Sequence, residues 1–493
     1  MPTSHRDGPS RDRLLNYRNM QAGRNFVAAS LALLAGLAGL TTAAAGADPA
    51  PTPTPRALPY DVVLVTLDTL RRDRLPIYGY PLDTAPNLSA LARSSVVFDN
   101  ALAASVRTTP SHASMLTGVT PFDHGVLLNK GRLNDGVPTL AEILKSRGCR
   151  TAGFVSSVTL SRRTGLERGF EVYDDDVGAT QERPAPETLA RAREWLSAIP
   201  AAEPVFLFVH FFEPHYPYSP PADCARRFLP AGEAPAPSPS FPELHAMRAR
   251  GFTRPEIEVL KARYDGEVCA VDRAVGEVLR LLRERGSLER TLLLVVADHG
   301  ETLDDRVWMF DHGAQLYDEQ ARVPLLVRFP NAAHGGDRVA AAVTHVDLLP
   351  TVLDVLGFKP QLAPGGVSLT AALRGDLVLG RRALVTLGSS EARQVPHLRP
   401  APLEGGLAAA VRLGALKLVV YPTADGEVSE LFDLDHDPRE QVAVNGSRPA
   451  DVHRLRRRLD AWLGGRPELL RTAAAPYLEP RDEDALRSLG YLE

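Results

Sequence analysis

Cysteine is scarce in this sequence. Its scarcity excludes a metal site made of closely spaced cysteine pairs and a cysteine nucleophile in the segment described below. The 493 residues contain only Cys149, Cys224 and Cys269, and no two of them have the spacing of a metal-binding pair. An odd number leaves at least one thiol unpaired in a monomer. A Cys224–Cys269 bridge and free buried thiols both remain open. No cysteine lies in the segment that we identify below as the candidate nucleophile turn.

The sequence also lacks an excess of basic residues and shows no internal repeat. Its 56 Lys and Arg against 60 Asp and Glu give a formal net charge of −4. A general nucleic-acid binder needs basic side chains to neutralise phosphates, so this class is excluded. The hydrophobic share of 44% and the length are sufficient for one large α/β domain or two domains with an ample core. The sequence also does not show the set of long apolar segments that a protein with several membrane spans would have.

The N-terminus has the pattern of a secretion signal. Several arginines precede an apolar run, and small residues follow it before an A-x-A type cleavage site, which predicts a signal peptide at 1–47. Met20 is an alternative start that gives a more compact signal. Residues 48–59 are proline-rich and read as an extended linker. We therefore expect export to the periplasm or the medium. An uncleaved membrane anchor at 26–47 is the alternative.

Apolar runs typical of buried strands alternate with helical patterns over residues 60–375. This alternation predicts an α/β fold with a large, mostly parallel sheet sandwiched by helices. Residues 376–493 differ, with short alternating segments followed by a helical pattern at 450–463. They predict a smaller C-terminal subdomain made of an antiparallel sheet and a helix. Residues 214–242 are proline-rich and are expected to form an irregular surface excursion.

Three clusters of polar residues follow apolar runs at predicted strand ends. They are Asp68, Glu213 with His215, and Asp298 with His299. Ligand sites of open α/β sheets lie outside the carboxyl ends of the strands, so we expect these clusters to meet. Two carboxylates and one imidazole suit a divalent cation such as Ca²⁺, Mg²⁺, Mn²⁺ or Zn²⁺. The pattern predicts a metal-assisted site for a tetrahedral anion.

Residues 108–118 form the most specific segment. Pro110 suits the first position of a helix, and Gly118 suits its end. Thr108 and Thr109 would then lie at a helix N-terminus, where free N–H groups favour an anion. A hydroxyl at that place becomes a nucleophile if a metal lowers its pKa, and Thr108 would also be a fourth metal ligand. The alternative is that Thr109 is only a helix cap and Thr108 a loop residue.

Six segments in order along the chain resemble motifs of the sulfatase family within the alkaline phosphatase superfamily. The resemblance runs from about residue 60 to the end of the chain and implies the fold and the metal ligands Asp68, Thr108, Asp298 and His299. The matching segments are 68–80, 108–118, 213–218, 297–301, 312–325 and 430–438.

Three positions depart from the family pattern. Thr108 stands where the family has the Cys or Ser that becomes formylglycine, so no formylglycine is expected. His112 replaces the motif's Arg, and Thr69 stands where many members have a second Asp. Within the superfamily, an unmodified Thr nucleophile goes with phosphoryl transfer. The resemblance therefore implies phosphodiester or phosphonate monoester chemistry more than ordinary sulfatase chemistry.

The resemblance also implies the residues that handle the substrate. We expect His312 to donate a proton to the leaving oxygen and His215 to bind the anion. Asn129, 21 positions after Thr108, is expected to contact a substrate oxygen, and so are His112 and Lys130. A less favoured possibility is a second metal held by Glu213, His215 and His312. His124 and His210 are interpreted as structural.

These observations predict a metal-dependent, sulfatase-like hydrolase of sulfate or phosphate esters, with an anionic ester as its partner. Two alternatives remain open. One is a transferase that hands the phospho group to a lipid or glycan hydroxyl. The other is a non-catalytic protein that keeps the fold and binds a ligand.

Overall fold

A computed structural model describes residues 58–178, 181–359, 365–375 and 382–471. The predicted signal peptide at 1–47 and nearly all of the linker at 48–59 lie outside these residues and remain predictions. No helix among the described residues is long and apolar enough to cross a membrane.

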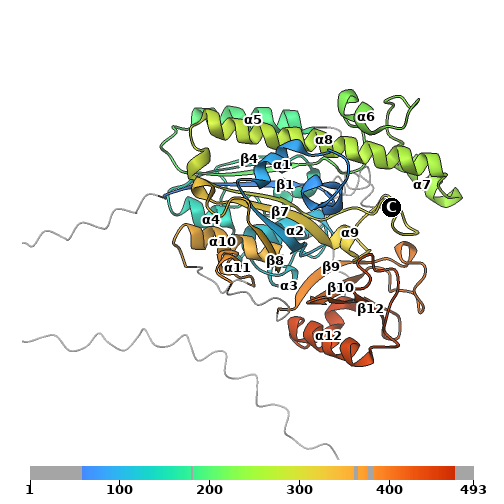
Figure 1. The fold of residues 1–493 in the computed structure, drawn as a ribbon. Coiled ribbons are helices and arrows are strands. Elements are labelled where there is room, and N and C mark those ends of the chain that lie inside the picture. Colours follow the sequence, from blue (N-terminus) through green and yellow to red (C-terminus); the bar gives the residue numbers. More distant parts are fainter. Residues whose placement is uncertain (1–57, 179–180, 360–364, 376–381, 472–493) are drawn as a thin grey trace, which may run out of the picture. The chain divides into compact units, whose positions relative to one another are not determined.

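The main sheet has eight strands in the order β4-β3-β5-β1-β6-β7-β2-β8 (Figure 1). Neighbouring strands are parallel except where β7 pairs with β6 and β2, both of which it meets in antiparallel orientation. The central strands are buried along their whole length, as the unbroken apolar runs predict. Their bounds are β1 Asp61–Leu67, β2 Val96–Leu102, β3 Arg150–Phe154, β4 Val172–Asp174, β5 Val205–Phe211, β6 Thr291–Ala297, β7 Arg322–Arg328 and β8 Arg338–Thr344.

Helices cover both faces of this sheet (Figure 1). On one face α1 and α5 each pack against the long α8; on the other, α2 contacts α4 and α10. The helices of this part are α1 Pro86–Ala92, α2 Thr108–Thr117, α3 Pro121–His124, α4 Leu140–Lys145, α5 Ala185–Ala198, α6 Ala222–Phe228, α7 Phe241–Arg250, α8 Arg254–Glu284, α9 Asp318–Ala321, α10 Leu348–Val355 and α11 Thr370–Leu373.

A second sheet of four antiparallel strands, in the order β12-β11-β10-β9, follows in the C-terminal part. It comprises β9 Leu384–Ser390, β10 Gly406–Leu413, β11 Leu416–Pro422 and β12 Glu427–Asp433, and α12 Pro449–Trp462 packs on β10 and β11. The predicted fold class is confirmed. The short alternating segments of the sequence, 408–411, 417–421 and 430–433, lie in β10, β11 and β12, and the helical pattern at 450–463 corresponds to α12. The sequence did not predict β9, the strand that pairs with β10 on its other side.

One local prediction needs correction, and one open alternative is resolved. The proline-rich stretch 214–242 contains a helix, α6, and not only irregular chain. Cys224 on α6 forms a disulfide with Cys269 on α8, which resolves the open alternative in favour of the bridge and fixes this excursion to the long helix. Cys149 remains a free, buried thiol.

The strand register places the site. In the parallel pair β1–β6, Leu67 lies opposite Ala297, so the next residues, Asp68 and Asp298, leave the sheet side by side. The backbone continues this pairing, since Asp298 N donates to Leu67 O at 3.3 Å and Asp68 N donates to Phe211 O at 3.1 Å. The ends of β1, β5 and β6 therefore meet at one edge of the sheet, as expected.

Candidate active site

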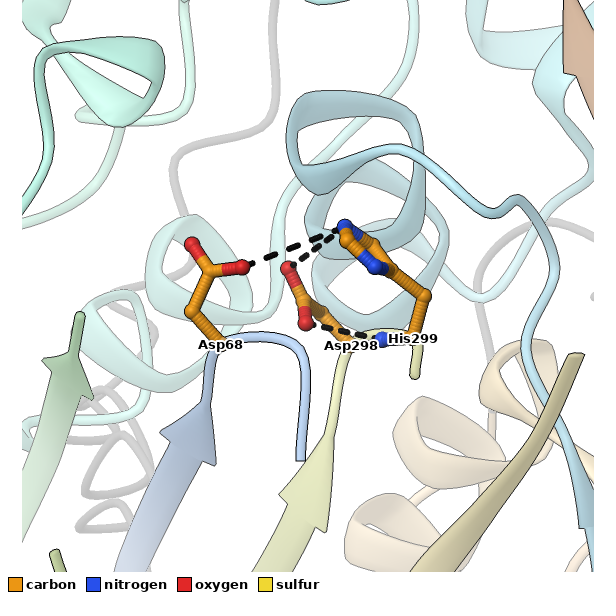
Figure 2. Close-up of side chains that lie close together, drawn as sticks. All are labelled: Asp68, Asp298 and His299. Carbon is orange, nitrogen blue, oxygen red and sulfur yellow. Dashed lines mark hydrogen bonds and ion pairs between the residues drawn. The ribbon is translucent and has the colours of Figure 1, made fainter. Parts of the chain in front are cut away.

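Asp68, Asp298 and His299 point toward one another from the ends of β1 and β6 (Figure 2). All three are fully buried, and one ligand atom from each lies within 4.8 Å of the others. His299 Nε2 is 3.9 Å from Asp68 Oδ1 and 3.6 Å from Asp298 Oδ2. Among the described residues this is the one group of three or more side chains with metal-ligating atoms so close together.

The chemistry of this group fits a cation. Neither oxygen of Asp68 nor Oδ2 of Asp298 accepts a hydrogen bond, although all are buried. His299 Nδ1 lies 2.9 Å from Gly300 O and therefore carries the hydrogen, which leaves a lone pair on Nε2 directed at two carboxylates. Lone pairs that face one another in a buried place need a positive charge between them.

Burial changes the pKa values of the two carboxyls. Burial raises the pKa of Asp68 well above its usual value, and the nearby Asp298 and Glu301 carboxylates raise it further. Burial also raises the pKa of Asp298 to about 7, against hydrogen bonds from the Thr69 and His299 amides that lower it. A cation reverses this tendency, because it stabilises the ionised form of both groups.

Thr108 is the first residue of α2, so the helix begins two residues before Pro110, where the sequence had placed its first position. Gly118 ends it in the left-handed region at φ 69°, as predicted. The Thr108 hydroxyl Oγ1 lies 3.5 Å from His299 Nε2 and is fully buried. The structure thus brings the candidate nucleophile to the candidate metal ligands.

His112 does not lie where a substrate contact was expected. It is fully buried beneath the N-terminal turn of α2, with Nδ1 2.8 Å from Thr108 O and Nε2 2.9 Å from Thr66 Oγ1. Both ring nitrogens are therefore used inside the protein. Burial lowers the pKa of His112 to about 4, so the ring is neutral at neutral pH. The family's Arg is replaced by a neutral group that ties α2 to β1.

Asn129 is buried next to the same helix N-terminus. Its side-chain Oδ1 accepts a hydrogen bond from Thr109 N at 3.0 Å, which fixes the orientation of the amide. The amide nitrogen Nδ2 is buried and makes no hydrogen bond. A fixed donor without a partner beside Thr109 is suited to a substrate oxygen. Lys130 follows it and is half-buried.

His215 and His312 lie on the other side of the site. The ring of His312 is 4.5 Å from that of His299 and 5.0 Å from that of His215, between centroids. His215 Nδ1 bonds Tyr216 O, which leaves Nε2 as its second polar atom. Burial, and then the neighbouring His312, lower the pKa of His215 well below its usual value. The three imidazoles form one cluster.

Glu301 distinguishes His312 from the other two histidines. Its buried carboxylate Oε1 lies 3.5 Å from His312 Nδ1. Burial alone would lower the pKa of His312, but the charge and hydrogen bond of Glu301 raise it above its usual value. His312 is therefore the histidine of this cluster that holds a proton most readily.

The structure does not bring Glu213 into a second metal group with His215 and His312. Glu213 Oε1 accepts a hydrogen bond from Ala185 N, 2.9 Å away, at the start of α5. The metal-ligating group found among the described residues does not include it. The reason is local, since the backbone turns after β5 and directs Glu213 and His215 to different neighbours.

His210 was interpreted as structural, yet it touches the candidate metal group. Ser156 N donates to its Nδ1 at 3.3 Å, so the hydrogen is on Nε2, which lies 3.4 Å from Asp68 Oδ2. A ring nitrogen that carries hydrogen is a donor and not a metal ligand. His210 Nε2 thus faces the Asp68 carboxylate at 3.4 Å without forming a hydrogen bond to it. Its position inside β5 gave no sequence signal, because an inward polar residue on a buried strand resembles a core histidine.

The C-terminal sheet also reaches the site. Arg107, which precedes Thr108, donates from Nη2 to Ser389 Oγ at 2.6 Å and to Glu391 Oε1 at 2.7 Å. The carbonyl of Gly313, next to His312, accepts hydrogen bonds from Ser389 N at 2.7 Å and Oγ at 3.0 Å. Gly313 has φ 107°, and a Cβ there would lie 2.9 Å from the Arg107 guanidinium carbon, so only glycine fits.

An open, mostly parallel sheet with a candidate cation group, a buried hydroxyl at a helix N-terminus and a histidine cluster at its strand ends is an α/β architecture with a ligand site outside the sheet. Residues 60–358 match the family model described as Sulfatase. The chain therefore belongs to the sulfatase family, and the resemblance inferred from its motifs is confirmed.

Characterised relatives are distant but extend over most of the chain. The choline-sulfatase of Rhizobium meliloti is 26% identical over 79% of this chain and 84% of its own length. The ulvan-active sulfatase of Formosa agariphila is 27% identical over 82% of this chain and 80% of its own. Among solved structures, the phosphonate monoester hydrolase of Agrobacterium radiobacter has a TM-score of 0.66 at 21% identity and covers 82% of this chain and 96% of its own, which shows a common fold. The family match and the relatives identify the class as enzymes that hydrolyse esters.

Proposed function

We propose that this protein is a metal-dependent hydrolase of phosphate-type esters, phosphodiesters or phosphonate monoesters, in which Thr108 is the nucleophile. The observation that carries the proposal is the contact between the Thr108 hydroxyl and the Asp68, Asp298 and His299 group, 3.5 Å from His299 Nε2. A divalent cation bound by these residues would lower the pKa of the hydroxyl and offset negative charge in the transition state.

The residues of the chain divide the remaining work. Thr108 Oγ, after its proton has passed to solvent, bonds to the phosphorus while the ester oxygen leaves, and the protonated His312 gives that oxygen a proton. Asn129 Nδ2 donates to the anion as it is held at the N-terminus of α2. His215 Nδ1 donates to Tyr216 O, so Nε2 of the neutral ring carries a lone pair, and His215 would bind the anion only when a second proton makes it an imidazolium. Water then attacks the phosphorus of the Thr108 adduct and gives a proton to the now neutral His312, which restores its protonated form. The Thr108 oxygen leaves and takes a proton from solvent, which releases the phosphate or phosphonate product.

The nucleophile favours phosphoryl over sulfuryl esters. A formylglycine hydrate releases sulfate by breaking a carbon–oxygen bond, whereas a threonine adduct has no second hydroxyl on the same carbon. Its hydrolysis must occur at the central atom. His112 adds to this preference, because the neutral ring that replaces the family's Arg makes both of its bonds inside the protein.

The test is a paired assay of purified protein with Ca²⁺, Mg²⁺, Mn²⁺ or Zn²⁺ supplied. It compares p-nitrophenyl sulfate with the phosphate monoester, a phosphodiester and a phosphonate monoester. We expect turnover of a phosphoryl or phosphonate ester that falls at least about 10³-fold in Thr108→Ala. Full activity of Thr108→Ala would contradict the mechanism. Faster turnover of the sulfate ester would contradict the substrate class.

The same experiment separates the remaining alternatives. A transferase would consume a phospho-ester only when a lipid or glycan hydroxyl is added. A binding protein would take up the cation and remain inert on every ester. The placement of the Thr108 hydroxyl beside the three candidate ligands weighs against the latter, since a protein that only binds the cation does not need a nucleophile there.

We also propose that the protein is exported. The Cys224–Cys269 disulfide supports this, because such bonds persist in oxidising compartments. The N-terminal pattern at 1–47 supports it independently. N-terminal sequencing of the protein recovered from the host's periplasm or medium tests the proposal, and an intact N-terminus in a membrane fraction would favour the anchor.

A further inference from the structure

The turn that follows Asp68 is held in an unfavourable conformation. Thr69 has φ 55°, in the left-handed region that a β-branched residue rarely adopts. In this conformation Thr69 N donates to Asp298 Oδ1 at 3.1 Å. The turn therefore sets the place of two candidate cation ligands, Asp68 by chain connection and Asp298 by a hydrogen bond. Something outside the turn must stabilise it.

Tyr264, in the middle of α8, supplies that support. Its hydroxyl donates to Thr69 O at 2.7 Å and accepts from Arg71 N at 2.8 Å. One phenol oxygen thus bridges a carbonyl and an amide two residues apart, on either side of Leu70. Tyr264 is fully buried, and so are Thr69 and Leu70, so water cannot replace either bond.

A second contact joins the same turn to the loop that carries Asp298 and His299. The Arg71 side chain donates from Nη1 to Glu301 O at 3.0 Å, two residues after His299. It is also paired with Asp73 and Asp305, which keeps its guanidinium in one place. Tyr264 therefore orients the backbone of Arg71, and the Arg71 side chain links the loop of Asp68 to the loop of His299.

We propose that Tyr264 is a positioning residue for the cation site: its hydroxyl locks the 68–71 turn so that Asp68 and Asp298 present their free oxygens to one ion. The inference rests on the cation of the proposed function but concerns a residue that touches neither ion nor substrate. Residues that hold metal ligands in place without touching the metal typically change the metal affinity by about 10–100-fold when they are mutated. We expect a loss of about this size when the Tyr264 hydroxyl is removed.

The variant is Tyr264→Phe, which removes one oxygen and keeps the ring. Its matched control is Tyr78→Phe. The hydroxyl of Tyr78 also donates to a carbonyl, Phe98 O at 3.2 Å, and accepts from an amide, Leu325 N at 3.2 Å, but away from the metal group. Both variants lose the same chemistry, so a difference between them reports on position.

Each full-length protein is titrated calorimetrically with Ca²⁺, Mg²⁺, Mn²⁺ and Zn²⁺, without substrate. We expect the tightest ion of the wild type to bind about 10–100-fold more weakly to Tyr264→Phe and equally well to Tyr78→Phe. Equal affinity in Tyr264→Phe, or the same loss in both variants, would overturn the inference. A wild type that binds none of the four ions would overturn the proposed cation, and this inference with it.

A measurement on the wild type alone covers the case in which Tyr264→Phe does not fold. Coupling is reciprocal, so an ion that depends on the turn must also stabilise the turn. Saturation with the ion is expected to slow hydrogen exchange at the Arg71 amide and to leave the Leu325 amide unchanged. If calorimetry shows binding while exchange at Arg71 does not change, Tyr264 does not act on the ion.

Discussion

The cation side and the histidine side of the site are built in different ways. Asp68, Asp298 and His299 follow directly from two neighbouring strands whose register aligns them. His215 and His312 lie in turns, and His312 depends on Glu301 and on hydrogen bonds from β9 to the adjacent Gly313. One side is fixed by the sheet itself, and the other by contacts between distant segments. Around the first, the support comes from the 68–71 turn and Tyr264, and around the second it comes from Glu301 and Ser389.

The largest effect is expected from removing a ligand on the cation side. Asp298→Asn keeps an oxygen that can accept hydrogen bonds from the Thr69 and His299 amides. It replaces Oδ2, the oxygen available to the ion, with an NH₂ group. Asp298→Asn should weaken cation binding by more than about 100-fold, beyond the loss typical of an outer partner, and abolish turnover.

Calorimetry and an ester assay check this, with Asp61→Asn as control. Asp61 begins the same β1 strand at its opposite end, where it bonds Val205 N at 3.0 Å and pairs with Arg290. If the two variants bind the ion equally well, the assignment of Asp298 as a ligand is wrong.

A change on the histidine side should have a smaller effect that depends on the leaving group. His312→Gln removes the proton donor, so esters of alkyl alcohols should lose about 10²–10⁴-fold in kcat. p-Nitrophenyl esters should lose much less, because their leaving oxygen needs no proton. Rates on both series test this, with the exposed His334→Gln as control. Equal losses on both series would show that His312 does not act as the acid.

The smallest effect is expected at Glu301 and appears in the pH profile. The carboxylate raises the pKa of His312, so the acid is present below that pKa and is lost as pH rises through it. Glu301→Gln removes the charge, which lowers the pKa and moves the basic limb of kcat to lower pH. The rate below the limb should change by less than about tenfold, since Gln still accepts a hydrogen bond. If the pH profile of kcat does not shift, Glu301 does not control the pKa of His312.

The same contrast explains what could be predicted from the sequence. Asp68, Asp298, His299 and the turn at Thr108 were identifiable because strand ends and helix ends leave local patterns. The roles of His112, His210 and Tyr264 were not, since each depends on which atom of a distant segment meets the ring. β9 was missed for a related reason, because its pairing with β10 across an intervening loop is decided by tertiary contacts.

The hydrogen bonds from β9 to the active-site turns have a consequence for where the functional unit ends. The family match stops at residue 358, but Ser389 and Glu391 lie beyond it and hold Gly313 and Arg107. A protein cut at the family boundary would retain every candidate ligand and lose the support of its proton donor. The minimal enzyme is thus longer than residues 60–358, and joining these residues to another C-terminal part would require a replacement for the Ser389 and Glu391 side chains.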